Sequence, residues 1–150
     1  MTQLLPMTPD DCCEAARLHA RAFFKGWDAH AFQAFLADPL VHGLKVVQND
    51  HLCGYILWRA IDAEAEILTL VVDPSSQRSG LGGRLLSALF THLREKKIAE
   101  LFLEVAEDNA PARFFYTKHG FIFLSKRPKY YPRENQPHAA ALNFAKKLRS

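Results

Sequence analysis

The chain has 150 residues, of which 49% are hydrophobic and 23% are charged, values typical of one folded domain. This composition excludes a disordered tail, a collagen-like rod and a low-complexity segment. No apolar run approaches the ~20 residues of a membrane helix, and the first residues lack the basic and apolar regions of a secretory signal. We therefore expect a single domain over residues 1–150, in the cytosol and without membrane association.

Three cysteines, Cys12, Cys13 and Cys53, are the only thiols in the sequence. Their odd number and irregular spacing argue against a disulfide framework. No CxxC or CxxH pair is present, so the sequence also predicts no structural zinc site and no bound metal.

Charge is distributed unevenly along the chain. Residues 1–75 carry 5 basic and 10 acidic side chains, whereas residues 76–150 carry 14 basic and 6 acidic ones. This polarity suggests an anionic ligand near the second half: cofactor phosphates, nucleic acid, or only a solvated face. Because no groove-reading helix can be identified, we expect no nucleic-acid partner.

Two helices are predicted near the start. Thr8 followed by Pro9 and two acids is typical of a helix start, and this helix is expected to end near Phe23. Asp28 then caps a second, shorter helix, which Asp38 ends because a proline follows it.

Alternating strands and helices make up the rest of the chain. Asn49-Asp50 is a turn signal, and three strands around it predict an antiparallel meander. Leucines at helical spacing then predict a helix between the third and fourth strands, hence a right-handed βαβ unit. Asn109 caps a further helix that ends at Gly120. The expected strands are 44–48, 52–60, 65–72, 101–105, 121–124 and 139–148, and the leucine-rich helix is 80–96.

A glycine-rich loop, Gly80-Leu81-Gly82-Gly83, joins a strand to this helix. Glycines allow a ligand close to the backbone, and the amides of a helix start bind anions. The loop is neither a P-loop, because Arg84 replaces its lysine, nor a dinucleotide fingerprint, because Leu85 replaces its third glycine. From the pattern alone it is a candidate phosphate site or merely a glycine-rich turn.

The segment from Gln77 to Gly82, QRSGLG, resembles the Q/R-x-x-G-x-G/A acyl-CoA loop of the GNAT N-acetyltransferase superfamily. The runs LEV at 103–105, NAPA at 109–112 and FYTKHGF at 115–121 resemble the rest of the family core. Among its members, the chain is most similar to the ribosomal-protein-alanine N-acetyltransferases (the RimI group). The resemblance implies an α/β fold with a mixed, mostly antiparallel sheet, a parallel βαβ cofactor-binding core, and helices on both faces.

The same resemblance implies that acetyl-CoA is the cosubstrate. Backbone groups of Leu70, Val71 and Val72 would pair with its pantetheine arm, and the side chain of Asn109 would touch that arm. The loop would bind its pyrophosphate through main-chain amides, the residues implied at this site being Gln77, Arg78, Ser79, Gly80, Leu81, Gly82 and Gly83.

By resemblance, Glu104 is the general base and Tyr116 the general acid that protonates the leaving thiolate. We expect Glu104 to be partly desolvated, because apolar residues precede it; Glu66, on the preceding strand, is the alternative base. Since no cysteine is placed as a nucleophile, direct transfer is expected. At pH 7, deprotonating a peptide α-amine costs about 1 kcal/mol, against about 4.6 kcal/mol for a lysine.

The favoured acceptor is therefore a protein N-terminal α-amine. A small-molecule amine or a lysine remains open, as does a non-catalytic CoA-binding module. Trp27, Tyr130 and Tyr131 are candidates for an acceptor groove, while Trp58 is expected to be core and His119 a surface histidine. The chain departs from the RimI pattern at Gln136-Pro137-His138, where that group carries an acidic pair, so its acceptor can differ.

Overall fold

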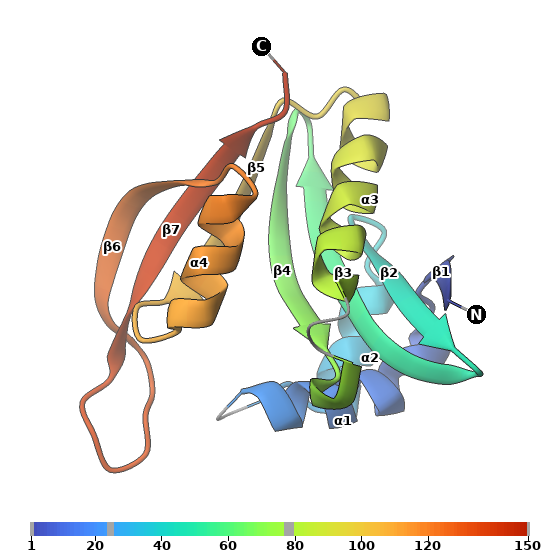
Figure 1. Cartoon of the computed structure of the whole chain (residues 1–150), viewed down its shortest axis with the longest axis horizontal. Helices are drawn as coiled ribbons and strands as arrows, with labels where there is room; N and C mark the ends of the chain where they lie inside the picture. The colour runs from blue at the N-terminus through green and yellow to red at the C-terminus, as the bar shows by residue number, and fades with distance from the viewer. Residues whose placement is uncertain (1, 24–25, 77–79, 150) are drawn as a thin grey trace.

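The computed structural model describes residues 2–23, 26–76 and 80–149, and these form a seven-stranded sheet flanked by four α-helices (Figure 1). The strands are β1 Thr2–Pro6, β2 Val41–Gln48, β3 His51–Ile61, β4 Glu64–Val72, β5 Glu100–Ala106, β6 Ile122–Tyr131 and β7 Ala139–Lys147. The helices are α1 Cys12–Ala22, α2 Ala29–Ala37, α3 Leu81–Glu95 and α4 Ala110–Lys118, with 3-10 turns at Pro9–Asp11 and Pro74–Ser76.

The strand order is β1-β2-β3-β4-β5-β7-β6, and each neighbouring pair is antiparallel except β4 and β5. Helix α3 connects these two parallel strands, which confirms the predicted βαβ unit. The antiparallel meander of β2, β3 and β4 is confirmed as well.

The parallel pair is short. β4 and β5 are in register only from Glu64↔Glu100 to Glu66↔Phe102, and beyond this point no register pair joins residues 67–72 to residues 103–106. The two strands therefore diverge, and Figure 1 shows the opening between them. This divergence positions the candidate site.

A bulge in β4 lies at the start of the divergence. Leu57 pairs with Thr69 while the next residue, Trp58, pairs with Ile67, so Leu68 is the extra residue. Ile67 packs with the α3 side of the sheet and Val71 with the α1 side, although residues four apart in a regular strand face the same way. The bulge thus changes which side chains of β4 reach each face.

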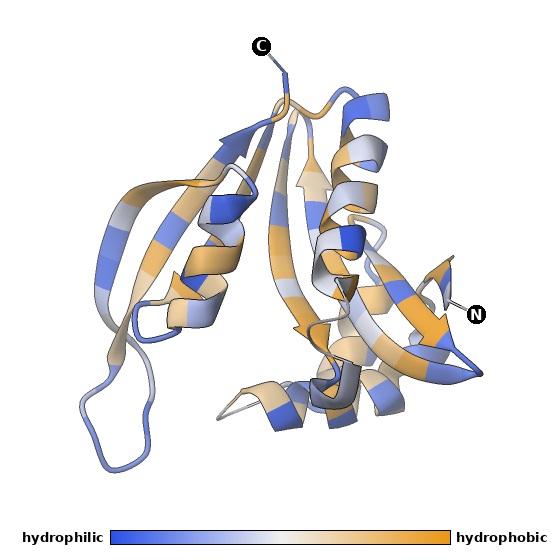
Figure 2. Ribbon diagram, in the orientation of Figure 1, coloured by the Kyte–Doolittle hydropathy of each residue, from blue (hydrophilic) through white to orange (hydrophobic). Residues whose placement is uncertain are grey.

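Two hydrophobic clusters pack on the two faces of the sheet. Figure 2 shows apolar and polar residues interspersed along the strands and helices that supply them. On one face, the leucines of α3 at helical spacing pack against the central strands. On the other face, α1 and α2 supply Ala15, Leu18 and Phe32 against Tyr55 and Leu57. Helices on both faces of a mixed sheet confirm the expected fold class.

Two of the predicted helix caps, Asp28 and Asn109, are confirmed. Asp28 Oδ1 accepts from the Ala31 N–H at 2.8 Å, and Asn109 Oδ1 accepts from the Ala112 N–H at 3.2 Å. Thr8 caps a 3-10 turn that precedes α1, so the first helix is not continuous from Pro9.

The predicted turns are also confirmed. Gly120 has φ +95° after α4, a conformation that glycine adopts without strain. Asn49 and Asp50 both have positive φ between β2 and β3, as a tight hairpin requires.

Two strand predictions were wrong. Strand β1 was not expected; it is a short edge strand that forms by pairing with β2, which no local pattern reveals. β6 extends to Tyr131, well past the predicted end at Leu124. Most of this edge strand is exposed, so its sequence shows no burial alternation and includes Pro128, which an edge position tolerates.

Candidate functional site

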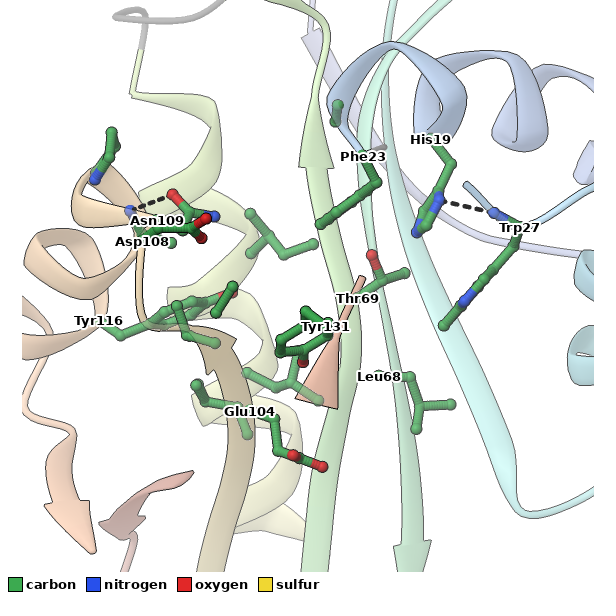
Figure 3. A pocket seen from close by; sticks show the side chains of 18 of the residues that line it. His19, Phe23, Trp27, Leu68, Thr69, Glu104, Asp108, Asn109, Tyr116 and Tyr131 are labelled. Carbon is green, nitrogen blue, oxygen red and sulfur yellow. Dashed lines mark hydrogen bonds between the residues drawn. The ribbon is translucent and has the colours of Figure 1, made fainter. Parts of the chain in front are cut away.

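A cavity of about 590 Å³ lies where β4 and β5 diverge (Figure 3). Its floor consists of β4 residues 67–70 and β5 residues 103–106. Side chains from α1 and the segment before α2 line one side, while the start of α4 and the end of β6 line the other. The cavity is therefore built by segments from both halves of the chain.

Tyr116 lines the cavity from α4 and is 8% exposed. Its ring packs edge-to-face against Phe115 at 5.2 Å and Phe121 at 5.5 Å between centroids. Burial raises the pKa of this phenol well above its ordinary value, so Tyr116 keeps its proton at neutral pH. The arrangement supplies a fixed, protonated hydroxyl group at the cavity wall.

Asn109 also lines the cavity while it caps α4. The capping bond fixes the orientation of the side-chain amide, so the structural role predicted for Asn109 and a contact with a ligand are compatible. Figure 3 shows Asn109 and Tyr116 on the same side of the divergent strands.

Glu104 lines the cavity from β5 and is partly buried, but its carboxylate has a cationic partner that the sequence analysis did not anticipate. Arg127 Nη2 donates to Glu104 Oε1 at 3.1 Å and to Oε2 at 2.9 Å, and the Glu104 side chain is 24% exposed. The Arg127 guanidinium also lies 3.8 Å above the centre of the Tyr130 ring. The sequence analysis missed this ion pair because β6, which carries Arg127, extends further than its sequence pattern indicated.

Glu66, the alternative base, does not line the cavity. It lies in the paired part of β4, opposite Arg59 of β3 and Phe102 of β5. Of these two carboxylates, only Glu104 lines the cavity.

His19 is a cavity residue that the sequence analysis did not identify. Its Nδ1 accepts a hydrogen bond from the backbone N–H of Trp27 at 3.0 Å, and its ring stacks on Phe23 at 4.3 Å and on Trp27 at 4.8 Å. Burial lowers the pKa of His19 to about 4, so the imidazole is neutral at pH 7. The only sequence signal was the i, i+4 spacing of His19 and Phe23 on the predicted helix.

The end of β6 closes the opposite wall. Tyr131 and Arg133 line the cavity, whereas Tyr130 does not and is 47% exposed. Arg133 donates to Asp108 through Nε at 2.7 Å and through Nη2 at 2.8 Å, which lowers the pKa of Asp108. Of the predicted acceptor-groove residues, Trp27 and Tyr131 are thus at the cavity and Tyr130 is outside it.

The glycine-rich loop leads into α3. Gly80 has φ +80°, a left-handed conformation that glycine adopts without strain, and it precedes the first helical residue, Leu81. A Cβ at Gly82 would lie 3.4 Å from the Phe115 ring, and one at Gly83 would lie 3.5 Å from His119 Nε2. A methyl group at either position would therefore be in ordinary van der Waals contact with Phe115 or His119. Gln77, Arg78 and Ser79 lie outside the described residues.

The three predicted β4 contacts have different environments. Leu70 lines the cavity, Val71 is buried in the α1 cluster, and Val72 is half-buried against the α3 cluster.

Two further sequence predictions concern packing. Trp58 is 2% exposed, which confirms that it belongs to the core. His119 is half-buried rather than on the surface, because its Nδ1 lies 2.8 Å from the Phe115 carbonyl oxygen and its ring packs on Phe115.

Within the described residues, the three cysteines are free thiols and no helix is long and apolar enough to cross a membrane. The same residues contain no cluster of three or more His, Cys, Asp or Glu side chains arranged to hold a metal ion.

Comparison with known proteins gives concordant results. The chain is 37% identical to a [ribosomal protein bS18]-alanine N-acetyltransferase of Haemophilus influenzae over 90 residues, 60% of this chain and 61% of that one. It is 29% identical to the Escherichia coli K12 protein of the same name over 132 residues, 88% of each chain. The alignment with the Haemophilus relative thus spans less than two thirds of that protein.

Solved structures agree in fold. The ribosomal-protein-S18-alanine N-acetyltransferase from Escherichia coli matches with a TM-score of 0.92 and 27% identity, covering 99% of this chain and 94% of that one. Ard1 from Thermoplasma volcanium matches with a TM-score of 0.90 at 22% identity over 99% of both chains, a likeness of fold alone. The acetyltransferase (GNAT) family model matches residues 13–121. The chain therefore belongs to the GNAT acetyltransferase family.

Proposed function

We propose that this protein transfers the acetyl group of acetyl-CoA directly to the N-terminal α-amine of a protein, with a ribosomal protein as the favoured acceptor. The observation that carries the proposal is the cavity at the divergence of β4 and β5, which has Glu104 and Tyr116 on its walls. Similarity to bS18-alanine N-acetyltransferases supports the choice of acceptor. Because ribosomal proteins are in the cytosol, the reaction would take place there.

Acetyl-CoA supplies the activated acyl group. Its pyrophosphate would bind at the start of α3, where Gly80 turns the chain and two residues of the first helical turn, Gly82 and Gly83, carry no side chains. A helix of 15 residues offers its free amides and the positive end of its dipole to an anion there. The acyl end would lie in the cavity beside Leu70 and Asn109, which the divergence of the strands opens.

Transfer would begin when the incoming ammonium group loses a proton, and the resulting neutral amine would attack the thioester carbon. Glu104 would take the ammonium proton, directly or through a water molecule, and Tyr116 would give its proton to the departing thiolate. The raised pKa of the Tyr116 phenol suits a general acid, because the hydroxyl group stays protonated at neutral pH. Because Arg127 holds both Glu104 oxygens, the incoming ammonium would compete with this guanidinium for the carboxylate.

The acceptor class can be tested with purified protein, acetyl-CoA and three amines, using mass spectrometry to locate the acetyl group. The amines are a peptide with a free N-terminal alanine, the same peptide N-blocked and carrying one lysine, and a polyamine. We expect acetylation at the α-amine of the first peptide. Labelling confined to the lysine or the polyamine would contradict the α-amine assignment, and binding of acetyl-CoA without turnover of any amine would identify a CoA-binding module.

A further inference from the structure

Thr69 carries a buried hydroxyl group without a partner. The residue is 6% exposed and lines the cavity, and its Oγ1 has no hydrogen-bond partner within the described residues. A buried hydroxyl in this state is unfavourable until a water molecule or a ligand supplies a hydrogen-bond partner. The bulge at Leu68 sets its position, because it shifts the register of β4 immediately before Thr69.

His19 provides a hydrogen-bond donor in the same cavity. Because Nδ1 accepts the Trp27 N–H and the ring is neutral, the ring proton is on Nε2. Figure 3 shows that this second nitrogen is turned away from Trp27. In the same view, His19 and Phe23 lie on the opposite side of β4 from Asn109 and Tyr116.

We propose that His19 and Thr69 bind the first residue of the acceptor peptide, an inference that rests on the proposed function. The His19 Nε2–H donates to the first carbonyl oxygen, and the Thr69 hydroxyl accepts an N–H of the attacking amine. The lone pair of that amine then remains directed at the thioester carbon.

This pair of contacts selects the acceptor by its chemistry. In a peptide N-terminus, the amine and the first carbonyl are separated by one carbon atom, so the amine can meet Thr69 on β4 while the carbonyl meets His19 on α1. A lysine ε-amine or a polyamine has only methylene groups at this distance and leaves the His19 donor unpaired. A substrate that leaves a buried polar group of the site without a hydrogen-bond partner binds less favourably, and this penalty is a common basis of strong discrimination between substrates.

Thr69→Val tests the hydroxyl with little change of shape, and Thr91→Val is the matched control on an exposed position of α3. We expect Thr69→Val to unfold at the wild-type temperature or higher, because it removes an unpaired polar group. Its kcat/KM for the alanine peptide should fall about tenfold, the effect of one hydrogen bond, with unchanged CoA affinity. Thr91→Val should leave both kinetics and affinity unchanged.

His19→Phe retains an aromatic ring for stacking and removes the Nε2–H donor. We therefore expect the same loss of kcat/KM for the alanine peptide with unchanged CoA affinity. If this variant fails to fold, Thr69→Val alone tests the inference. Two results would overturn the inference: a Thr69→Val protein with wild-type peptide kinetics, or one whose affinity for CoA falls as much as kcat/KM. A wild-type protein that acetylates no peptide α-amine would overturn the proposed function, and this inference with it. Wild-type turnover together with an unaffected Thr69→Val protein would overturn the inference alone.

Discussion

Replacing Glu104 tests the proposed chemistry sharply, because β4 carries a matched carboxylate, Glu66, outside the cavity. Glu104→Gln retains the shape of the side chain but cannot take a proton. General-base catalysis contributes ~10²–10⁴-fold to rate, so kcat/KM for an alanine peptide should fall at least about a hundredfold. That loss corresponds to about 2.7 kcal/mol in the barrier.

The same substitution should barely affect stability. The Glu104 and Arg127 side chains are 24% and 52% exposed, and ion pairs of this kind contribute about 0–1 kcal/mol. For a chain of this length, 1 kcal/mol shifts Tm by roughly 2–4 °C. A large loss of kcat/KM together with a Tm shift of only a few degrees would therefore indicate a catalytic defect and not unfolding.

The assay is release of the CoA thiol, followed with a thiol reagent at several pH values, with a melting curve for each variant. Glu66→Gln is the control and should retain wild-type kinetics. The assignment is refuted if Glu104→Gln turns over within twofold of wild type, or if Glu66→Gln loses as much activity.

Three further outcomes follow from named contacts. Tyr116→Phe retains the packing against Phe115 and Phe121, so kcat should fall about a hundredfold with little change in Tm; unchanged turnover would exclude Tyr116 as the acid. Asn109→Ala removes the α4 cap and should cost about 1 kcal/mol by denaturant unfolding, whereas Asn109→Asp should retain the cap; equal stability of all three proteins would contradict the capping role. The His19 pKa is about 4 in the fold and near 6.5 when unfolded, so the unfolded chain binds more protons in between and stability falls as pH decreases from 6.5 to 4. His19→Phe should show a smaller drop in Tm over this range, and an identical pH dependence would refute the buried neutral state.

The βαβ core and its loop could be predicted because their signals are local. Leucines at helical spacing, Asp28 and Asn109 as caps, and Gly120 as a helix end each depend on residues close in sequence. Glu104 and Tyr116 came from motif resemblance, Trp27 was a candidate for the acceptor groove, and the fold brings all three to one cavity.

The missed features depend on contacts between distant segments. β1 forms only because β2 offers it an edge, and β6 continues because β7 pairs with it through Tyr131↔Ala139. The Arg127 ion pair with Glu104 follows from that extension, so it was not predictable from the LEV motif. His19 reaches the cavity because Trp27 folds back onto it, a contact across the segment between two helices.

The central claim is that the divergence of β4 and β5 holds both substrates. A crystal structure with a bisubstrate analogue, CoA joined through an acetyl group to an alanine peptide, tests it most directly. We predict that the acetyl carbon lies between the two strands near the Tyr116 hydroxyl, with the pyrophosphate at the start of α3 and the first peptide carbonyl at His19. An analogue bound elsewhere on the protein, with this cavity closed by its own side chains, would contradict the account.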